Sequence, residues 1–132
     1  MVIDAFVEAH LPLVRISGDL PVREALEAHV KSLIARYAGP QGRLIAQIIA
    51  EGQYDQATLV DFKARFWNDR NAAVDKLIRR GIEGLFRSDI EPHDAAEMIY
   101  APIYFHLLFS SGPLDDALGE RLVDQAILGL GA

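Results

Sequence analysis

The stretch from Asp55 to Phe86, "DQATLVDFKARFWNDRNAAVDKLIRRGIEGLF", has the pattern of one long helix. It contains no proline, and its first glycine is Gly81. Two neighbouring stripes follow helical spacing and are apolar except for Asn71, with Leu59, Phe62, Phe66, Ala73 and Leu77 in one and Val60, Ala64, Trp67, Asn71, Val74 and Ile78 in the other. At 1.5 Å per residue this helix is roughly 48 Å long, more than the ~30 Å diameter of a small domain. We therefore expect a central helix against which the rest of the chain packs.

Shorter helices are predicted on both sides of this stretch. Helical spacing, with proline and glycine at the boundaries, places them at residues 3–11, 21–37, 44–52, 92–109 and 114–127. Ala and Leu supply 34 residues whereas Thr occurs once, which favours helix over strand. The sequence thus predicts a single all-α domain over residues 1–132, with about six helices in a bundle around one long central helix.

Charge and composition exclude several classes of function. The net charge is −6, and the 13 Lys and Arg residues are scattered, whereas a surface that binds duplex nucleic acid needs several of them on one face. The chain has no Cys, and its start, "MVIDAFVEAHLPLV", lacks the basic region of a signal peptide. No run of 18 uncharged apolar residues predicts a membrane span. We expect a cytoplasmic protein with neither a membrane nor, through these residues, a nucleic acid as partner.

Aromatic and polar side chains on two predicted helices indicate a pocket for a small molecule. Pro102 lies inside the helix at 92–109, where it removes a backbone hydrogen bond and favours a bend. Such a bend would leave a gap beside the long helix, with aromatic walls and a few polar groups as in a typical ligand site. The predicted lining consists of Phe62, Phe66, Trp67, Asn71, Tyr100, Ile103 and Tyr104.

A plainer interpretation of these residues remains open. Aromatic residues at helical spacing also form ordinary cores, and Pro102 can simply wrap its helix around one. Asn71 is the most informative residue, because a buried amide without partners costs about 1–3 kcal/mol. It is either satisfied by neighbouring groups or available to a ligand.

The last two predicted helices carry more apolar surface than the long helix can cover. The turn "SSGP" joins them, and Leu114, Leu118 and Leu122 follow it at helical spacing. We therefore predict a two-fold homodimer in which these helices meet their symmetry mates as a four-helix bundle. The expected interface residues are His106, Phe109, Leu114, Leu118 and Leu122.

Catalytic and metal-binding patterns are weak. His93 and Glu97 stand four residues apart and could share a metal ion, but two ligands without a third are too few. The sequence has no glycine-rich phosphate loop and no serine on a nucleophile elbow. We expect no enzyme activity, no catalytic residues, no metal and no cofactor.

Residues 70–128 resemble the C-terminal domain of TetR-family transcriptional regulators. The resemblance lies in the order of "RRGIEGLFRSD", "APIYFHLLFSSGPLDDAL" and "LVDQAILGL", and the opening "VIDAFVEAH" resembles that family's linker helix. It implies a domain that binds a small hydrophobic or aromatic effector, forms dimers and acts on DNA only through an N-terminal helix-turn-helix head. We find no such head in these 132 residues. The alternative is a helical oligomerisation module without a small-molecule ligand.

Overall fold

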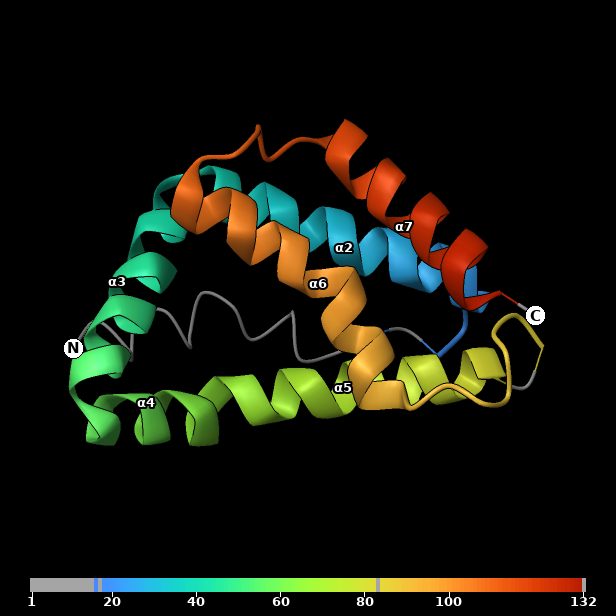
Figure 1. Ribbon diagram of the computed structural model, residues 1–132, viewed down its shortest axis with the longest axis horizontal. Coiled ribbons are helices and arrows are strands. Elements are labelled where there is room, and N and C mark those ends of the chain that lie inside the picture. Colours follow the sequence, from blue (N-terminus) through green and yellow to red (C-terminus); the bar gives the residue numbers. More distant parts are fainter. Residues whose placement is uncertain (1–15, 17, 83, 132) are drawn as a thin grey trace.

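The computed structural model describes residues 16, 18–82 and 84–131 (Figure 1). Its elements are α2 (Val22–Ala38), α3 (Pro40–Tyr54), α4 (Gln56–Phe62), the π-helix η2 (Lys63–Trp67), α5 (Asn68–Ile82), α6 (Pro92–Phe109) and α7 (Asp116–Leu130). The prediction of an all-α fold is confirmed. The helix expected at 3–11 lies outside the described residues. No helix in the described part of the chain combines the length and apolarity needed to cross a bilayer.

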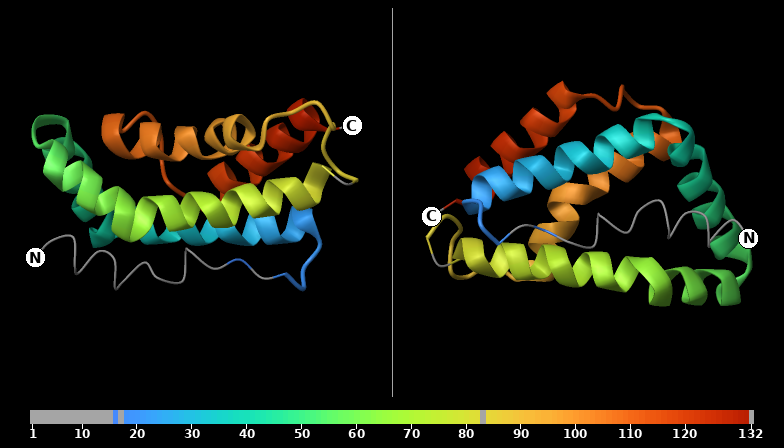
Figure 2. Two further views of the ribbon diagram at one scale, coloured as in Figure 1. Left: turned by 90° about the horizontal axis from the view of Figure 1, so that it is seen from below. Right: turned by 180° about the vertical axis from the view of Figure 1, so that it is seen from behind.

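Helix α2 contacts more of the other helices than the long helix does. It packs against α3, α5, α6 and α7, and Figure 2 shows α7 running alongside it. Its buried side chains are Ala25, Leu26, His29, Val30, Leu33, Ile34 and Tyr37. Because these positions recur every three to four residues and cover more than one face, α2 can pack against neighbours on several sides.

The expected long helix is present as α4, η2 and α5, which follow one another without a break along one side of the molecule (Figure 1). The five residues of η2 form a wider turn, in which the Asn68 amide donates to the Lys63 carbonyl. Because of this wider turn, residues spaced four apart stay on the same face over a longer stretch than they would in a regular α-helix. Phe62, Phe66, Arg70 and Val74 are therefore all buried, whereas Val60 is 66% exposed.

The long helix ends at Ile82, four residues before the predicted end at Phe86. The amides of Gly84, Leu85 and Phe86 all donate to the Gly81 carbonyl, which turns the chain. The Phe86 ring then lies against Gly81, in the space that a Cβ atom at this position would occupy. The missing side chain of Gly81 thus lets the chain fold back and bury Phe86.

Helix α6 is bent about halfway along, as Figure 1 shows. Pro102 lies near the middle of this helix, and the missing N–H and the bulk of its ring account for the change of direction. The Glu91 side chain caps the helix by accepting a hydrogen bond from the Asp94 amide at 2.8 Å. At the other end, Ser110 adopts a left-handed conformation (φ 51°) that turns the chain towards α7.

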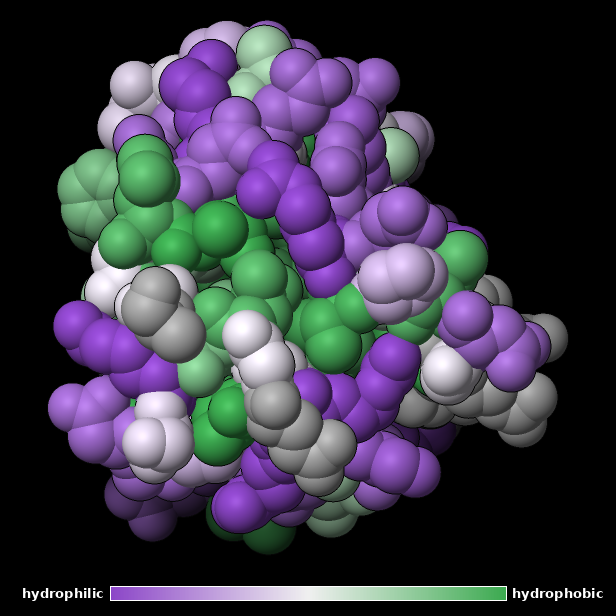
Figure 3. Space-filling model, turned by 90° about the vertical axis from the view of Figure 1, so that its right-hand side faces the viewer, coloured by the Kyte–Doolittle hydropathy of each residue, from purple (hydrophilic) through white to green (hydrophobic). Residues whose placement is uncertain are grey.

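Some apolar surface remains uncovered in one copy of the chain. Figure 3 looks onto the end of the molecule where α2 begins and where α5 and α7 end, and it shows apolar residues surrounded by hydrophilic ones. Leu20, just before α2, is 38% exposed, and Leu128, in the last turn of α7, is 85% exposed.

Candidate functional site

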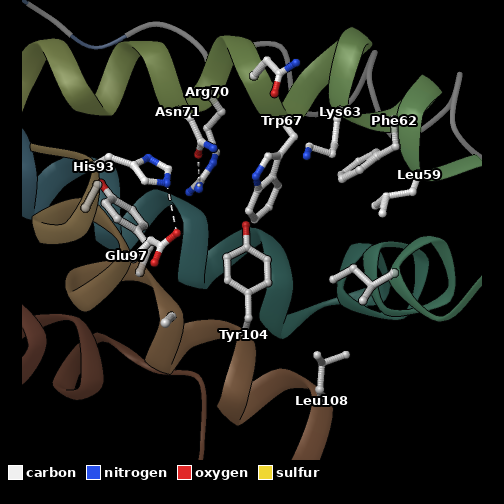
Figure 4. A pocket seen from close by; sticks show the side chains of 15 residues that line it. Leu59, Phe62, Lys63, Trp67, Arg70, Asn71, His93, Glu97, Tyr104 and Leu108 are labelled. Atoms are coloured by element: carbon white, nitrogen blue, oxygen red, sulfur yellow. Dashed lines mark hydrogen bonds and ion pairs between the residues drawn. The ribbon is translucent and has the colours of Figure 1, made fainter. Parts of the chain in front are cut away.

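A cavity of about 670 Å³ lies between the long helix and α6 (Figure 4). This volume falls within the usual range of small-molecule sites, about 300–1,000 Å³. Lys63, Asn68, His93 and Glu97 are exposed, so the cavity opens to solvent on their side. Its lining residues are Ile49, Leu59, Phe62, Lys63, Trp67, Asn68, Arg70, Asn71, His93, Ala96, Glu97, Tyr100, Ala101, Tyr104 and Leu108.

The structure brings most of the predicted pocket residues together at this cavity. Those that line it are Phe62, Trp67, Asn71, Tyr100 and Tyr104. The other two, Phe66 and Ile103, are each 0% exposed and lie in the core behind the cavity wall. The prediction that they line the cavity is corrected: they are core residues. Figure 4 shows Trp67 and Tyr104 pointing towards each other from opposite walls, with ring centroids 5.3 Å apart.

Arg70 is the main polar residue of the cavity, and it was not among the residues predicted from the sequence. Its side chain extends from α5 towards α6 (Figure 4) and is only 4% exposed. Its Cζ atom lies 4.5 Å from the centroid of the Trp67 ring, 5.0 Å from that of Tyr100 and 5.9 Å from that of Tyr104. Each such contact between a cation and an aromatic face contributes about 0.5–2 kcal/mol, which offsets part of the cost of burying the charge.

The guanidinium of Arg70 is incompletely hydrogen-bonded. Its Nη2 donates to Asn71 Oδ1 at 2.8 Å, so the Asn71 amide is satisfied by a neighbour. Its Nε and Nη1 are buried and have no acceptor. Among the residues that the structure describes, no carboxylate forms an ion pair with Arg70. A permanent charge is therefore buried with one neutral acceptor and aromatic rings around it, an arrangement that is costly without a counter-ion.

Two tyrosines from α6 place their rings beside this charge. The Tyr100 hydroxyl lies 2.6 Å from Nδ1 of the buried His29, and the Tyr104 hydroxyl lies 3.1 Å from that of Tyr37. Burial raises the pKa of Tyr100 and Tyr104 above the ordinary value, although the positive charge of Arg70 opposes the shift in both. Both phenols therefore stay neutral at physiological pH and retain a proton for hydrogen bonding.

The mouth of the cavity carries charged groups of both signs. His93 Nε2 lies 3.0 Å from Glu97 Oε1 within α6, whereas Lys63 on the long helix makes no ion pair with any described residue. In the described part of the chain, no group of three or more His, Cys, Asp or Glu side chains is placed to hold a metal ion. The spacing of His93 and Glu97 thus corresponds to a contact between two exposed side chains on one helix.

The predicted interface residues lie in different environments. Leu118 (3% exposed) and Leu122 (8%) are buried against the chain's own core, so they offer almost no surface to a second copy. Leu114 is partly buried against the same core, and the ring of the half-buried His106 packs over Gly112. Phe109, by contrast, is 70% exposed.

A spacing signal for Arg70 does exist in the sequence. Phe62, Phe66 and Arg70 stand four residues apart, and Tyr100 and Tyr104 have the same spacing on α6. Charged residues are rarely buried, so the pattern alone favours an exposed Arg70. The π-turn and the aromatic rings around it reverse that expectation.

The fold is shared with a solved transcription regulator. The crystal structure of the TetR family transcription regulator SCO0332 matches 98% of this chain and 72% of its own, with a TM-score of 0.86 and 22% sequence identity. The arrangement of helices is therefore that of an all-helical domain of this class. Residues 18–126 match the family model described as "Tetracyclin repressor-like, C-terminal domain", and the chain belongs to this family.

A curated relative agrees with the family. It is the "Uncharacterized HTH-type transcriptional regulator YdeS" of Bacillus subtilis (strain 168), 27% identical over 105 residues. The match covers 79% of this chain and 53% of the relative, so the chain spans about half of that protein's length.

Proposed function

We propose that this chain is the ligand-sensing and dimerisation domain of a TetR-like transcriptional regulator, acting as a repressor in the cytoplasm. In this proposal it binds a small hydrophobic or aromatic effector and relays binding to a DNA-binding domain joined to its N-terminal side. The observation that carries the proposal is the cavity of about 670 Å³ between the long helix and α6. Its aromatic walls and its few polar groups are typical of small-molecule sites.

The position of the cavity suggests how binding could be relayed. Its two walls are the long helix and α6, and both α5 and α6 also pack against α2. An effector that binds one arrangement of these helices more tightly than another shifts the population towards it. In the proposal, this shift changes the spacing of two DNA-binding domains in a dimer.

The competing function is a helical oligomerisation module whose interior is filled by its own side chains. The cavity favours the sensor, because a module that only assembles has no need to keep such a volume free. The buried polar groups around Arg70 favour it as well, since an apolar core of the same shape would be less costly.

Binding of small molecules to the purified chain tests this proposal. Trp67 is the only tryptophan and it lines the cavity, so its fluorescence reports binding directly. A library of small aromatic and aliphatic compounds would be screened by this signal and by melting temperature. Ala101→Phe, which adds a ring to the lining, should weaken the hits at least about tenfold, whereas Ala72→Phe on the exposed side of α5 should not.

Two results would contradict the sensor. One is a screen with no hits. The other is a set of hits whose affinity is the same in the Ala101→Phe variant as in the unmodified chain, because these compounds would then bind elsewhere.

A further inference from the structure

Arg70 is the one buried side chain with a permanent charge in the described part of the chain. A guanidinium stays protonated throughout the physiological range, so burial cannot neutralise it. Among the described residues its only acceptor is the neutral Asn71 amide oxygen, and its Nε and Nη1 have none. The cavity thus has one buried positive charge that none of the described residues balances.

We propose that the effector is an organic acid, in which a carboxylate binds Arg70 and an apolar body fills the rest of the cavity. This inference rests on the function proposed above. A carboxylate would supply the missing counter-ion and accept hydrogen bonds from the guanidinium, and such charge-assisted bonds are the strong ones in proteins. The apolar body would lie against Trp67, Phe62 and Leu108, which line the same cavity.

The charges of the lining favour an anion with a single charge. Arg70 and Lys63 are positive, and the one carboxylate of the lining, Glu97, is already paired with His93. Lys63 is exposed at the mouth, so Arg70 is the only buried cation available to the head group. A carboxylate matches this one buried charge, whereas the charge of a phosphate monoester, about −1.5 to −2, would exceed it.

The indole of Trp67 covers the guanidinium and must move for a ligand to reach it. Nε and Nη1 are shielded from solvent, and the Trp67 ring centroid lies 4.5 Å from Cζ. Tyr100 is buried whereas the Trp67 side chain is half-buried, and the Trp67 ring is the nearest to the guanidinium, so it is the ring that we expect to shift. Binding of a carboxylate should therefore change the fluorescence of this single tryptophan.

The experiment compares acids with their neutral isosteres. The purified chain is titrated with 4-phenylbutanoate, decanoate and the two corresponding primary amides, with Trp67 fluorescence and calorimetry as readouts. The affinity of each acid should be at least about tenfold higher than that of its amide. Arg70→Met should abolish this preference, and Arg79→Met, an exposed arginine on the same helix, should retain it. Arg70→Gln serves as a second variant if Arg70→Met does not fold. The comparison of acids with amides in the unmodified chain needs neither variant.

The outcomes separate the inference from the proposed function. Equal affinity for acids and amides, or a preference for acids that survives in Arg70→Met, would overturn the inference. If the amides bind in those cases and Ala101→Phe weakens them, the cavity is still a ligand site and the proposed function stands. If no acid and no amide binds, while the library screen finds other ligands of the cavity, only the inference fails. A blank result in both experiments contradicts both.

Discussion

The hydrogen bond from Arg70 Nη2 to Asn71 Oδ1 joins two of the three polar side chains that α5 contributes to the cavity, the third being Asn68. The Asn71 amide is therefore satisfied within the protein, because its oxygen accepts a hydrogen bond from the guanidinium. This hydrogen bond also gives Asn71 a definite role, which is to orient Arg70 and partly satisfy its charge.

Replacing Asn71 by Leu should therefore destabilise the fold. The substitution removes the acceptor and leaves a further buried donor of Arg70 unpaired, which costs about 1–3 kcal/mol in the free energy of unfolding. Urea denaturation measures this, and Asn68→Leu, an exposed neighbour on the same helix, should change stability little.

A double-mutant cycle identifies the cause. In an Arg70→Met background the guanidinium is already gone, so Asn71→Leu leaves no donor unpaired and should cost much less there than in the unmodified chain. An equal cost in both backgrounds would mean that Asn71 acts through other neighbours.

At the scale of single residues, the sequence patterns predicted aromatic residues of the cavity but not its buried charge. Trp67, Tyr100 and Tyr104 were expected from aromatic residues at helical spacing and a nearby proline, and they line the cavity. Arg70 was not expected, because its burial depends on the π-turn and on rings from a second helix. Neither feature can be inferred from the composition of the long helix alone.

Among the elements, proline marks two helix starts, because its fixed φ angle favours the first helical turn. Pro92 begins α6, as predicted, whereas α3 begins at Pro40, four residues before the predicted start at residue 44. The end of the long helix was predicted too late, because the pattern continues through Leu85 and Phe86. What ends the helix is the turn closed on the Gly81 carbonyl, in which the Phe86 ring packs against Gly81.

The role of Gly81 can be tested by comparing two variants, in which Gly81 or Gly129 is replaced by alanine. In Gly81→Ala the new Cβ would collide with the Phe86 ring, so the free energy of unfolding should fall by about 1–3 kcal/mol. Gly129 also lies in a helix, but nothing is within 4 Å of the corresponding Cβ position. Gly129→Ala should therefore leave stability unchanged or raise it by up to about 1 kcal/mol.

Thermal and urea denaturation of the two variants decide the point. A Gly81→Ala variant as stable as Gly129→Ala would show that the chain can turn after Ile82 without this close packing. The explanation for the early end of the helix would then be wrong.

At the scale of the whole molecule, exposed apolar residues on α6 and α7 favour assembly. Met98 (64% exposed), Phe105 (55%) and Phe109 (70%) lie seven and four residues apart on α6, and the rings of Phe105 and Phe109 stack at 4.9 Å. Leu128 on α7 is 85% exposed. These residues, in place of the buried Leu118 and Leu122, are the surface that we expect a second copy to cover.

We predict a dimer that buries more than about 1,000 Å² in total, the lower limit for a specific interface. Light scattering at tens of micromolar should give twice the mass of one chain. Phe109→Glu would place a charge within the interface and should give monomers, whereas Val60→Glu on exposed α4 should remain dimeric. A monomeric unmodified chain, or a Phe109→Glu variant of dimer mass, would contradict the prediction.

The sequence could not separate the two kinds of apolar surface. Helical spacing places Leu118 and Leu122 on one face of α7, but it does not say whether α2 or another chain covers that face. The contact with α2 follows from the close approach at Gly119, whose missing side chain lets α7 pack against Ile34 and Lys31. Such a close approach is visible only in three dimensions.

A crystal structure of the chain grown with the tightest-binding acid from the titrations tests the central claim most directly. The account predicts an apolar body between Trp67 and Tyr104, with a carboxylate oxygen about 2.7–2.9 Å from a nitrogen of Arg70. A ligand bound outside the cavity, with Trp67 still stacked on Arg70, would contradict it.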